Sequence, residues 1–395
     1  MSRSGGVERA SGPTSGLQSG LMQPGVALIG HPFDVLGVGA NLRSTAAALD
    51  SAQIPFDIRD AFDTGSDKIR GIQNFRYAGR VSVSDEKRRG NLFCLNANEM
   101  DMVSTYLGHE LFEDTYNIAC WMWELSKFPR QWTSSFRYVQ EIWAQSRFVQ
   151  DAIARKSPVP VIWMPQVVEP GAGDPEIAKA LGVPNDRFTF LFFFDFTSYV
   201  ARKNPNAVIA AFRRAFPLAD SDAVALVIKM NGIGKRIEDY EHFARGIDKQ
   251  DDRVILIDSV LDDRQMNGLI NGCDVFVSLH RSEGFGRGLA EAMYYGKATI
   301  ATGYSGNMDF TNHLNSCLVD YQLVPVREGE YPFWQNQYWA EPSVEHAAWW
   351  MRRLYGDRAL HQKIGTLAAE SIRSTHGAAV AGARMRDRLS GLALL

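Results

Sequence analysis

The segment Ser278-Leu-His-Arg-Ser-Glu-Gly-Phe-Gly-Arg-Gly-Leu-Ala-Glu-Ala-Met293 carries the strongest structural signal in the chain. It continues the apolar run Cys273-Asp-Val-Phe-Val-Ser278, which is typical of a buried parallel strand. Its glycines precede a stretch with helical composition. The segment therefore predicts a strand, a glycine-rich loop and a helix that begins near Gly286, the order found at ligand-binding turns of doubly wound α/β domains.

The glycine-rich loop predicts a site for an anion. Glycines at 284, 286 and 288 let the backbone approach a ligand closely. The first amides of a helix are unpaired, so they favour a phosphate. Glu291 lies more than one turn inside the helix, where it can accept hydrogen bonds from two hydroxyls, and Glu283 lies in the loop on the opposite side of the phosphates. A glycine-rich turn with two capping carboxylates and no ligand remains the alternative from these residues alone.

The alternation of strands and helices runs through the chain twice. Gly25-Val-Ala-Leu-Ile-Gly30 predicts the first strand, followed by a loop with Gly37 and Gly39 and by a helix over 41–50. Two such series indicate two parallel-sheet domains of α/β class. The other strands are expected at 56–60, 91–96, 116–123, 141–143 and 160–164 in the first series, and at 188–194, 223–229, 254–258, 273–278, 298–302 and 316–319 in the second.

The domain boundary is expected in the turn-rich segment Glu169-Pro-Gly-Ala-Gly-Asp-Pro175. We expect a disordered leader over 1–24, rich in Ser, Gly and Gln, then an N-terminal domain over 25–170, a C-terminal domain over 171–375 and a basic helix over 376–395. Ligands of open α/β sheets bind at the carboxyl ends of the strands. The two domains should therefore face each other across a cleft that holds the site.

Composition excludes several classes of protein. The 395 residues carry a net charge of −3. Residues 1–200 hold 19 Lys and Arg against 22 Asp and Glu, and residues 201–395 hold 23 of each, so neither half is basic enough to coat nucleic acid. The four cysteines form no CxxC or Cys/His cluster, which argues against a structural zinc and favours free thiols. With no long apolar stretch and no signal-peptide core, the chain is expected to be cytoplasmic.

The C-terminal end is the one basic region. Residues 351–395 carry 8 Lys and Arg against 3 Asp and Glu. Arg384, Arg386 and Arg388 form a basic run that is followed by four leucines, at 389, 392, 394 and 395. This pattern is compatible with peripheral contact with the anionic inner face of the plasma membrane. A solvated helix face is the alternative.

The motif Glu283-x7-Glu291, placed after a strand and before a helix, resembles the retaining glycosyltransferases of the GT-B superfamily, specifically family 4 (glycosyltransferase group 1). Arg202-Lys-Asn-Pro205 looks like the diphosphate-binding lysine segment of that family. Ser305-Gly-Asn-Met-Asp-Phe310 and Trp339-Ala-Glu-Pro342 look like a subgroup found in bacterial polysaccharide assembly. The resemblance covers roughly residues 25–375 and is more specific in 188–345. It implies two Rossmann-like domains that face each other across a cleft.

The resemblance also implies roles for individual residues. Glu291 would hold the ribose hydroxyls of a nucleotide sugar, Glu283 would bind hydroxyls of the sugar, and Lys203 would neutralise the departing diphosphate without a metal. Gly37 and Gly39 would approach the donor phosphates from the N-terminal domain. The amides of the loop would meet the diphosphate or the donor sugar: Gly284, Phe285, Gly286, Arg287 and Gly288.

Two positions depart from the family pattern. Ser198 stands where the family has an arginine, five residues before Lys203, and Arg202 is the candidate for the second positive charge. Glu124 stands near the place of an N-domain histidine. We expect it to face the cleft and act in catalysis, with an ordinary carboxylate at a helix start as the alternative. His280, just before the Glu283 loop, is expected either to reach the donor sugar or to orient the loop.

Taken together, the sequence predicts a retaining glycosyltransferase of the hexosyltransferase class. It would move a sugar from a nucleotide donor to a hydroxyl of a glycan or lipid-linked acceptor, with no metal or other cofactor. The resemblance implies a front-face mechanism, because no carboxylate is placed as an obvious nucleophile. The alternatives are a nucleotide-sugar epimerase, a phosphorylase and an inactive sugar-binding scaffold. A nicotinamide dehydrogenase is disfavoured, because the first turn lacks the GxGxxG spacing.

Overall fold

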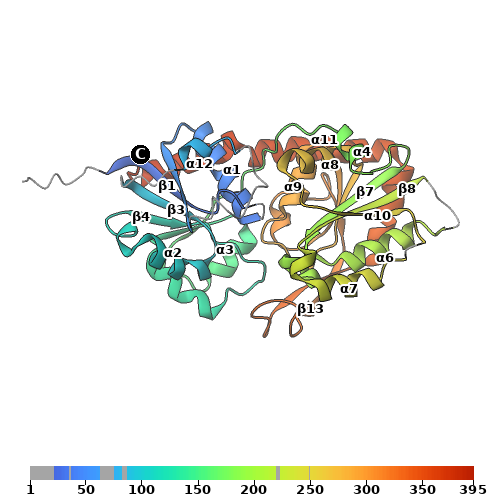
Figure 1. The fold of residues 1–395 in the computed structure, drawn as a ribbon, viewed down its shortest axis with the longest axis horizontal. Coiled ribbons are helices and arrows are strands. Elements are labelled where there is room, and N and C mark those ends of the chain that lie inside the picture. The colour runs from blue at the N-terminus through green and yellow to red at the C-terminus, as the bar shows by residue number, and fades with distance from the viewer. Residues whose placement is uncertain (1–21, 35–36, 63–74, 82–86, 219–222, 249) are drawn as a thin grey trace, which may run out of the picture.

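The computed structural model describes residues 22–34, 37–62, 75–81, 87–218, 223–248 and 250–395. Within these ranges the chain forms two parallel sheets with helices packed around them, one in each half of the molecule (Figure 1). The predicted α/β class with two parallel-sheet domains is confirmed. Most of the leader expected over 1–24 lies outside the described residues, and Gln23 and Pro24 already belong to the first strand.

The N-terminal sheet has six parallel strands in the order β2-β1-β3-β4-β5-β6. Its central strands are largely buried, as is typical of parallel sheets that are covered on both faces. The strands are β1 (Gln23–Gly30), β2 (Phe56–Asp60), β3 (Arg88–Cys94), β4 (Tyr116–Ala119), β5 (Glu141–Ala144) and β6 (Val161–Trp163). Its helices are α1 (Gly37–Ser51), α2 (Met100–Leu107) and α3 (Arg147–Ala154), with short 3₁₀ turns at η1 (Ala78–Arg80), η2 (Ala97–Glu99), η3 (His109–Leu111) and η4 (Arg130–Tyr138).

The C-terminal sheet has the order β12-β11-β10-β7-β8-β9, also with six parallel strands. They are β7 (Phe188–Asp195), β8 (Val224–Asn231), β9 (Val254–Asp258), β10 (Val275–Ser278), β11 (Ala298–Thr302) and β12 (Cys317–Val319). The main helices are α4 (Glu176–Ala180), α5 (Val200–Lys203), α6 (Pro205–Ala215), α7 (Ile237–Arg245), α8 (Asp263–Gly272), α9 (Arg287–Tyr294), α10 (Val344–Gly356) and α11 (Arg358–His376), with 3₁₀ turns η5 (Phe196–Ser198), η7 (Ile233–Lys235) and η8 (Gly306–Asp309).

An antiparallel hairpin leaves the C-terminal domain and packs against the N-terminal one. It consists of β13 (Tyr321–Pro325) and β14 (Tyr338–Pro342). Val326, Tyr331 and Trp339 belong to the same buried cluster as Trp121 and Trp123 of the N-terminal domain. Because apolar burial stabilises a contact in proportion to its area, this aromatic cluster ties the two domains together on one side of the cleft.

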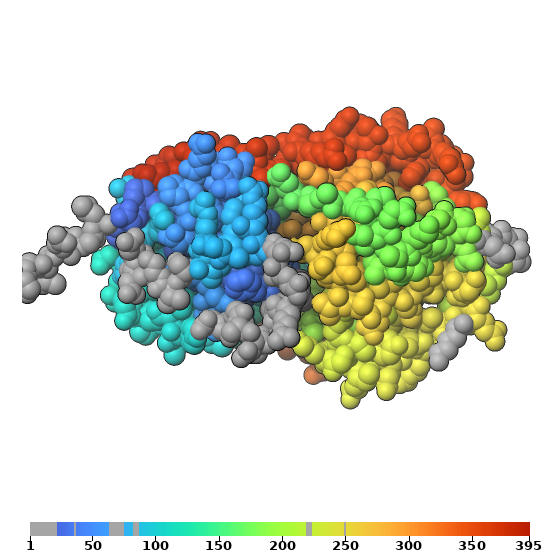
Figure 2. Space-filling model, turned by 45° about the horizontal axis from the view of Figure 1, so that its top comes forward, coloured from blue at the N-terminus to red at the C-terminus, as the bar shows by residue number. Residues whose placement is uncertain are grey.

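The chain crosses between the domains twice, at adjacent points. The first crossing follows β6, and there the Val168 amide donates to the carbonyl of His376 at the second crossing (2.8 Å). After Gly377, α12 (Ala378–Gly391) returns to the N-terminal domain and packs on α1. Figure 2 shows the C-terminal segment, in red, running along both halves of the molecule.

The return of α12 corrects the expectation for the basic tail. Leu389 and Leu394 lie in the buried core of the N-terminal domain, with Leu392 and Leu395 packed against it. Arg388 forms an ion pair with the buried carboxylate of Glu141, and the Arg384 guanidinium lies over the Trp163 ring. The leucines stabilise the N-terminal domain, so the expectation that they contact a membrane is wrong. No helix in the described ranges is long and apolar enough to cross a bilayer.

Candidate functional site

A large cavity lies between the carboxyl ends of the two sheets. Its volume is about 1180 Å³, and residues of both domains line it. Strand ends or the loops after them supply much of the wall, as in other open α/β sheets. Lys203, Glu283, Glu291 and Glu124 all reach this cavity, so the tertiary fold brings together four polar residues singled out from the sequence.

Lys203 and Arg202 lie on α5, a single helical turn held by two unusual backbone conformations. Tyr199 before it has φ 64°, and Asn204 after it has φ 57°. Asn tolerates the left-handed region better than most residues, whereas Tyr does not, so Tyr199 stores strain next to the site. The amides of Arg202 and Lys203 both donate to the Tyr199 carbonyl (3.0 and 3.3 Å). The turn therefore fixes two adjacent cations at the edge of the cavity.

Glu283 accepts from both cations. The Lys203 Nζ lies 2.5 Å from Oε1 and the Arg202 Nη1 lies 2.9 Å from Oε2. The Glu283 amide donates to the hydroxyl of Ser305, a residue with φ 76°. In this cluster, Arg202 and Lys203 follow β7 and Glu283 follows β10, while Ser305, which holds the Glu283 amide, follows β11. Contacts with the ends of three strands make the cluster rigid.

The electrostatics of this cluster are set by burial and by the ion pairs. Burial would raise the pKa of Glu283, but Arg202 and Lys203 outweigh it and lower that pKa to about 2. Burial lowers the pKa of Lys203, and the Glu283 carboxylate offsets only part of that effect. For Arg202, Glu283 and Glu124 together overcome burial and raise the pKa. Glu283 is therefore an anion at neutral pH, held by cations on both oxygens.

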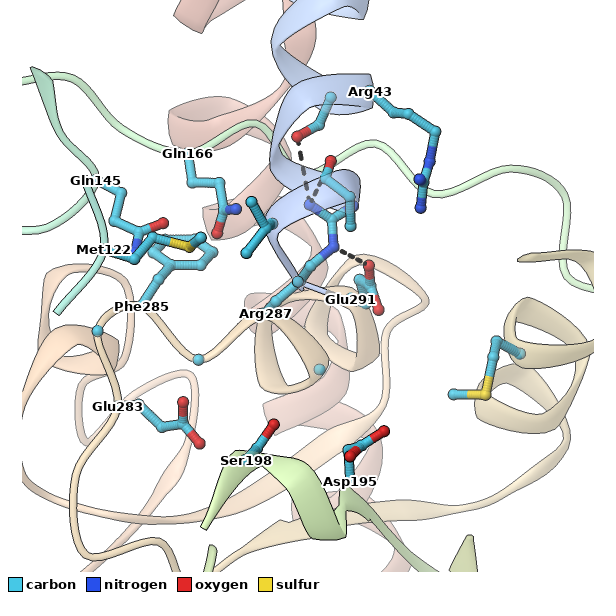
Figure 3. Close-up of a pocket in the computed structure, with 18 of the residues that line it drawn as sticks. Arg43, Met122, Gln145, Gln166, Asp195, Ser198, Glu283, Phe285, Arg287 and Glu291 are labelled. Atoms are coloured by element: carbon cyan, nitrogen blue, oxygen red, sulfur yellow. Dashed lines mark hydrogen bonds and ion pairs between the residues drawn. The ribbon is translucent and has the colours of Figure 1, made fainter. Parts of the chain in front are cut away.

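Glu291 lies at the other end of the loop, on α9. Its Oε1 accepts from Arg287 Nε at 2.7 Å, across one turn of the helix. Arg287 also reaches the N-terminal domain, where its Nη1 donates to the Ser44 hydroxyl (3.3 Å) and lies 3.4 Å from the Ala40 carbonyl. Figure 3 shows Arg287 between Glu291 and the helix of the other domain, with Glu283 and Ser198 on the opposite side of the cavity.

The three loop glycines line the cavity, and two of them, Gly284 and Gly288, have protein neighbours that exclude a side chain. Gly286 caps α9 with φ 97°. A Cβ at Gly284 would lie 2.9 Å from the Trp123 carbonyl of the N-terminal domain, and one at Gly288 would lie 2.5 Å from the Phe193 ring. The glycines thus allow close packing around the loop, while the start of α9 still faces the cavity beside Phe285 and Arg287.

Glu124 lies in the loop after β4, not at a helix start. Its Oε2 accepts from the Tyr331 hydroxyl (2.5 Å), and its carbonyl accepts from the Ser282 hydroxyl. Both donors come from the C-terminal domain. Glu124 therefore faces the cleft, as expected, and its carboxylate is held by the hairpin that bridges the domains.

Two of the expected donor contacts lie away from the cavity. His280 is buried, and its ring nitrogens bond to Ser278, Tyr304 and Asn307. It does not line the cavity, so it supports the loop and is not positioned to reach a donor sugar. Gly37 lines the cavity at the start of α1, whereas Gly39 is buried and a Cβ there would lie 2.2 Å from the Asp34 carbonyl.

Several residues that line the cavity were not predicted from the sequence. Arg43 on α1, Lys229 near the end of β8 and Tyr331 in the hairpin all line the site. Lys229 is buried beside Asn231, and burial lowers its pKa to about 8 despite Asp195 and Asp258. A single lysine in the otherwise apolar run Ala223–Ile228 was a usable signal. No local pattern marks Tyr331. Among the described residues, no His, Cys, Asp and Glu group is arranged to hold a metal ion.

The comparison with protein families decides the class of the C-terminal half. Residues 195–325 match the family described as glycosyl transferases group 1. The chain contains a group 1 glycosyl transferase domain. The matched region holds Lys203, Glu283 and Glu291, and the glycosyltransferase class predicted from the sequence is confirmed. No curated protein sequence matches the chain significantly.

Solved structures confirm the GT-B fold. Sucrose-phosphate synthase from Thermosynechococcus elongatus is similar with a TM-score of 0.66 at 14% identity, over 94% of this chain and 99% of that one. HepE from Anabaena, solved with UDP and glucose, gives 0.60 at 14% identity, over 93% and 100% of the two chains. A glycosyltransferase from Rickettsia africae gives 0.60 at 13% identity, over 92% and 97%. At these identities the likeness concerns the fold.

Proposed function

We propose that this group 1 glycosyltransferase is a retaining enzyme. It transfers a sugar from a nucleoside diphosphate donor to a hydroxyl of a glycan or lipid-linked acceptor in the cytoplasm. The observation that carries the proposal is the cavity between the domains. The start of α9 lies there between a carboxylate with two cations, Glu283 with Lys203 and Arg202, and a second carboxylate, Glu291. Helix amides and cations suit a diphosphate, and the carboxylates suit hydroxyls on either side of it.

The donor would lie along the glycine-rich loop. Glu291 binds the ribose, and the α9 amides with Lys203 bind the diphosphate. Glu283 accepts from hydroxyls of the sugar. HepE is described in complex with UDP-glucose, which makes a uridine donor the first to test. Because the Arg287 side chain occupies the Glu291 carboxylate in this structure, ribose binding requires Arg287 to move or to share that carboxylate.

In the proposed reaction, the bond between the anomeric carbon and the phosphate oxygen breaks, and its electron pair goes to the phosphate. The acceptor oxygen bonds to the same face of the sugar, and its proton passes to the departing phosphate. Lys203 stabilises the charge that develops on that phosphate. Glu283 does not serve as the nucleophile in this scheme, since two cations hold its oxygens and its pKa of about 2 makes it a weak base.

The acceptor would enter from the side of Glu124 and the hairpin. Trp123, Trp132 and Pro332 line that part of the cavity with Tyr331. Closure of the domains around bound donor and acceptor would exclude water from this region, which favours transfer over hydrolysis of the donor.

The proposal is tested by binding and then by turnover. A thermal-shift panel of UDP, GDP, ADP, CMP and dTDP should show a rise in melting temperature with one of them. The matching sugar nucleotides, incubated with an acceptor glycan, should release that nucleoside diphosphate and give a product with the donor's anomeric configuration by NMR. Formation of an isomer of the donor without an acceptor would instead identify an epimerase. A covalent sugar adduct on Glu124 would contradict the front-face mechanism.

A further inference from the structure

The charges around the proposed diphosphate site do not balance within the C-terminal domain. Lys203 and Arg202 together carry two positive charges, and the Glu283 carboxylate cancels one of them. A nucleotide sugar has one negative charge on each of two phosphates. Ser198, at the edge of the same site, contributes none. Since an uncompensated charge in a partly buried site is costly, a further cation facing the diphosphate would stabilise it. Lys229 of this domain also lines the cavity, but the carboxylates of Asp195 and Asp258 act on its charge.

Arg43 on α1 of the N-terminal domain is a buried cation in the cavity wall. Its side chain is 12% exposed. Its Nη1 donates to the carbonyls of Asp34 (2.6 Å) and Pro32 (3.2 Å), which hold the guanidinium without cancelling its charge. Asp263 lies 3.9 Å from Nε, but its carboxylate is 69% exposed, so solvent screens this pair.

Arg43 and Arg287 face the same part of the cavity. Burial lowers the pKa of Arg43 and the positive charge of Arg287 lowers it further, while the carboxylates of Asp263, Asp34 and Glu291 offset part of both effects. Figure 3 shows the two side chains on the same side of the cavity, above Glu291. Two cations that repel each other across a cavity form a site for an anion, because an anion between them relieves both the burial and the repulsion.

The position of Arg287 indicates which part of the donor lies there. Arg287 is one turn before Glu291 on α9, whereas Lys203 and Glu283 lie at the opposite end of the glycine-rich loop. If Glu291 binds the ribose, the group next to it is the phosphate attached to that ribose. The phosphate that leaves the sugar lies further along the loop, toward Lys203.

We propose that Arg43 is a donor-binding residue contributed by the N-terminal domain, and that Arg43 and Arg287 bind the ribose-side phosphate while Lys203 binds the sugar-side phosphate. This inference rests on the proposed function. Arg287 already donates to Ser44 and approaches Ala40, the neighbours of Arg43 on α1. Donor affinity therefore depends on contact between the domains, and a nucleoside diphosphate stabilises the closed arrangement.

The test is calorimetric titration of the full-length chain with the nucleoside diphosphate that gives the largest thermal shift, and with its monophosphate and nucleoside. Arg43→Gln should weaken binding of both phosphorylated ligands by about tenfold or more, and leave the nucleoside unchanged. Arg43→Lys should retain part of the phosphate affinity, because it keeps the charge. Arg214→Gln is the matched control, an exposed arginine on α6 that pairs with Glu345 outside the cavity, and should bind all three ligands like the wild type.

Each outcome bears on the Arg43 inference or on the proposed function. If Arg43→Gln binds the diphosphate as the wild type does, Arg43 has no role in binding it and the inference fails. Equal weakening of diphosphate and nucleoside, or an Arg43→Lys variant as weak as Arg43→Gln, shows that the guanidinium only supports the Pro32–Asp34 loop and overturns it as well. If the wild type binds none of the nucleoside diphosphates, the proposed function fails together with the inference.

Discussion

The two carboxylates of one sequence motif have different environments. Glu283 is held inside the C-terminal domain by Lys203 and Arg202, and its pKa falls to about 2. Glu291 pairs with Arg287, whose guanidinium also contacts α1 of the N-terminal domain. The ion-pair partners of Glu283 therefore all come from one domain, whereas the partner of Glu291 contacts both. Under the proposed function, a rigid site for the reacting phosphate would be combined with a nucleotide site that depends on contact between the domains.

The largest effect on activity is expected at Lys203, at the Glu283 end of the glycine-rich loop. Lys203→Ala removes the cation proposed to stabilise the leaving phosphate, and we expect transfer to slow by about 100- to 1,000-fold in kcat. Initial rates of nucleoside diphosphate release measure this. Lys363→Ala, an exposed lysine on α11, serves as the control and should retain full activity. A Lys203→Ala variant that is slowed less than Glu291→Ala would reverse the comparison.

A smaller effect, on binding, is expected at the other end. Glu291→Ala removes the acceptor for the ribose hydroxyls, so affinity for the preferred nucleoside diphosphate should fall about tenfold. The 2′,3′-dideoxy analogue is the informative probe. The wild type should bind it less tightly than the natural nucleotide, whereas Glu291→Ala should bind the two alike. If the variant still distinguishes them, another residue binds the ribose.

The pH dependence of the free energy of unfolding should reveal the contribution of the ion pairs at the Glu283 end of the glycine-rich loop. Because the pKa of Glu283 is lowered from 4.5 to about 2, its ion pairs contribute above pH 4.5, and the contribution is lost as the pH falls toward 2. The wild type should therefore exceed Glu283→Gln in free energy of unfolding at pH 5, and the difference should shrink at pH 3. Urea denaturation at the two values measures it. A constant difference would mean that Glu283 does not titrate in this range.

The smallest effect is expected at the contact between Glu124 and the hairpin. Tyr331→Phe removes one buried hydrogen bond to the Glu124 carboxylate and should cost about 1 kcal/mol in free energy of unfolding. It should also raise the KM for the acceptor more than the KM for the donor. Tyr338→Phe, on the exposed face of the same hairpin, is the control and should be neutral. An equal change in both KM values would argue against an acceptor site there.

The sequence predicted the sheet cores well because buried parallel strands leave local apolar runs. The runs at 56–60, 254–258 and 298–302 match the strands residue for residue. The loop before α9 was also predicted correctly, since the glycine spacing and the change from strand to helix pattern are local features of the sequence. Boundaries were less accurate: the strand expected over 116–123 ends at Ala119, because Trp121 and Trp123 pack into the aromatic cluster beneath the bridging hairpin.

Long-range contacts were not readable from local patterns. The hairpin over 321–342 was not expected to bridge the domains. The leucines at 389, 392, 394 and 395 were read as compatible with membrane contact or with a solvated helix face, because their apolar partners around β1 and β3 lie about 300 residues away in sequence. Arg43 had no local mark beyond being the one basic residue of α1. Its neighbours Arg287 and Asp263 come from the other domain.

By itself, the sequence determined the class of the protein, the two α/β series and the motif residues Lys203, Glu283 and Glu291. These follow from periodicity and from short motifs, which local chemistry fixes. Only the tertiary structure decided how charges are shared across the cavity: Glu283 between two cations, Arg287 on Glu291, and Arg43 beside them from the opposite domain. The physical reason is that Coulomb interactions and burial depend on distance in space, and the domain interface brings α1 and α9 together.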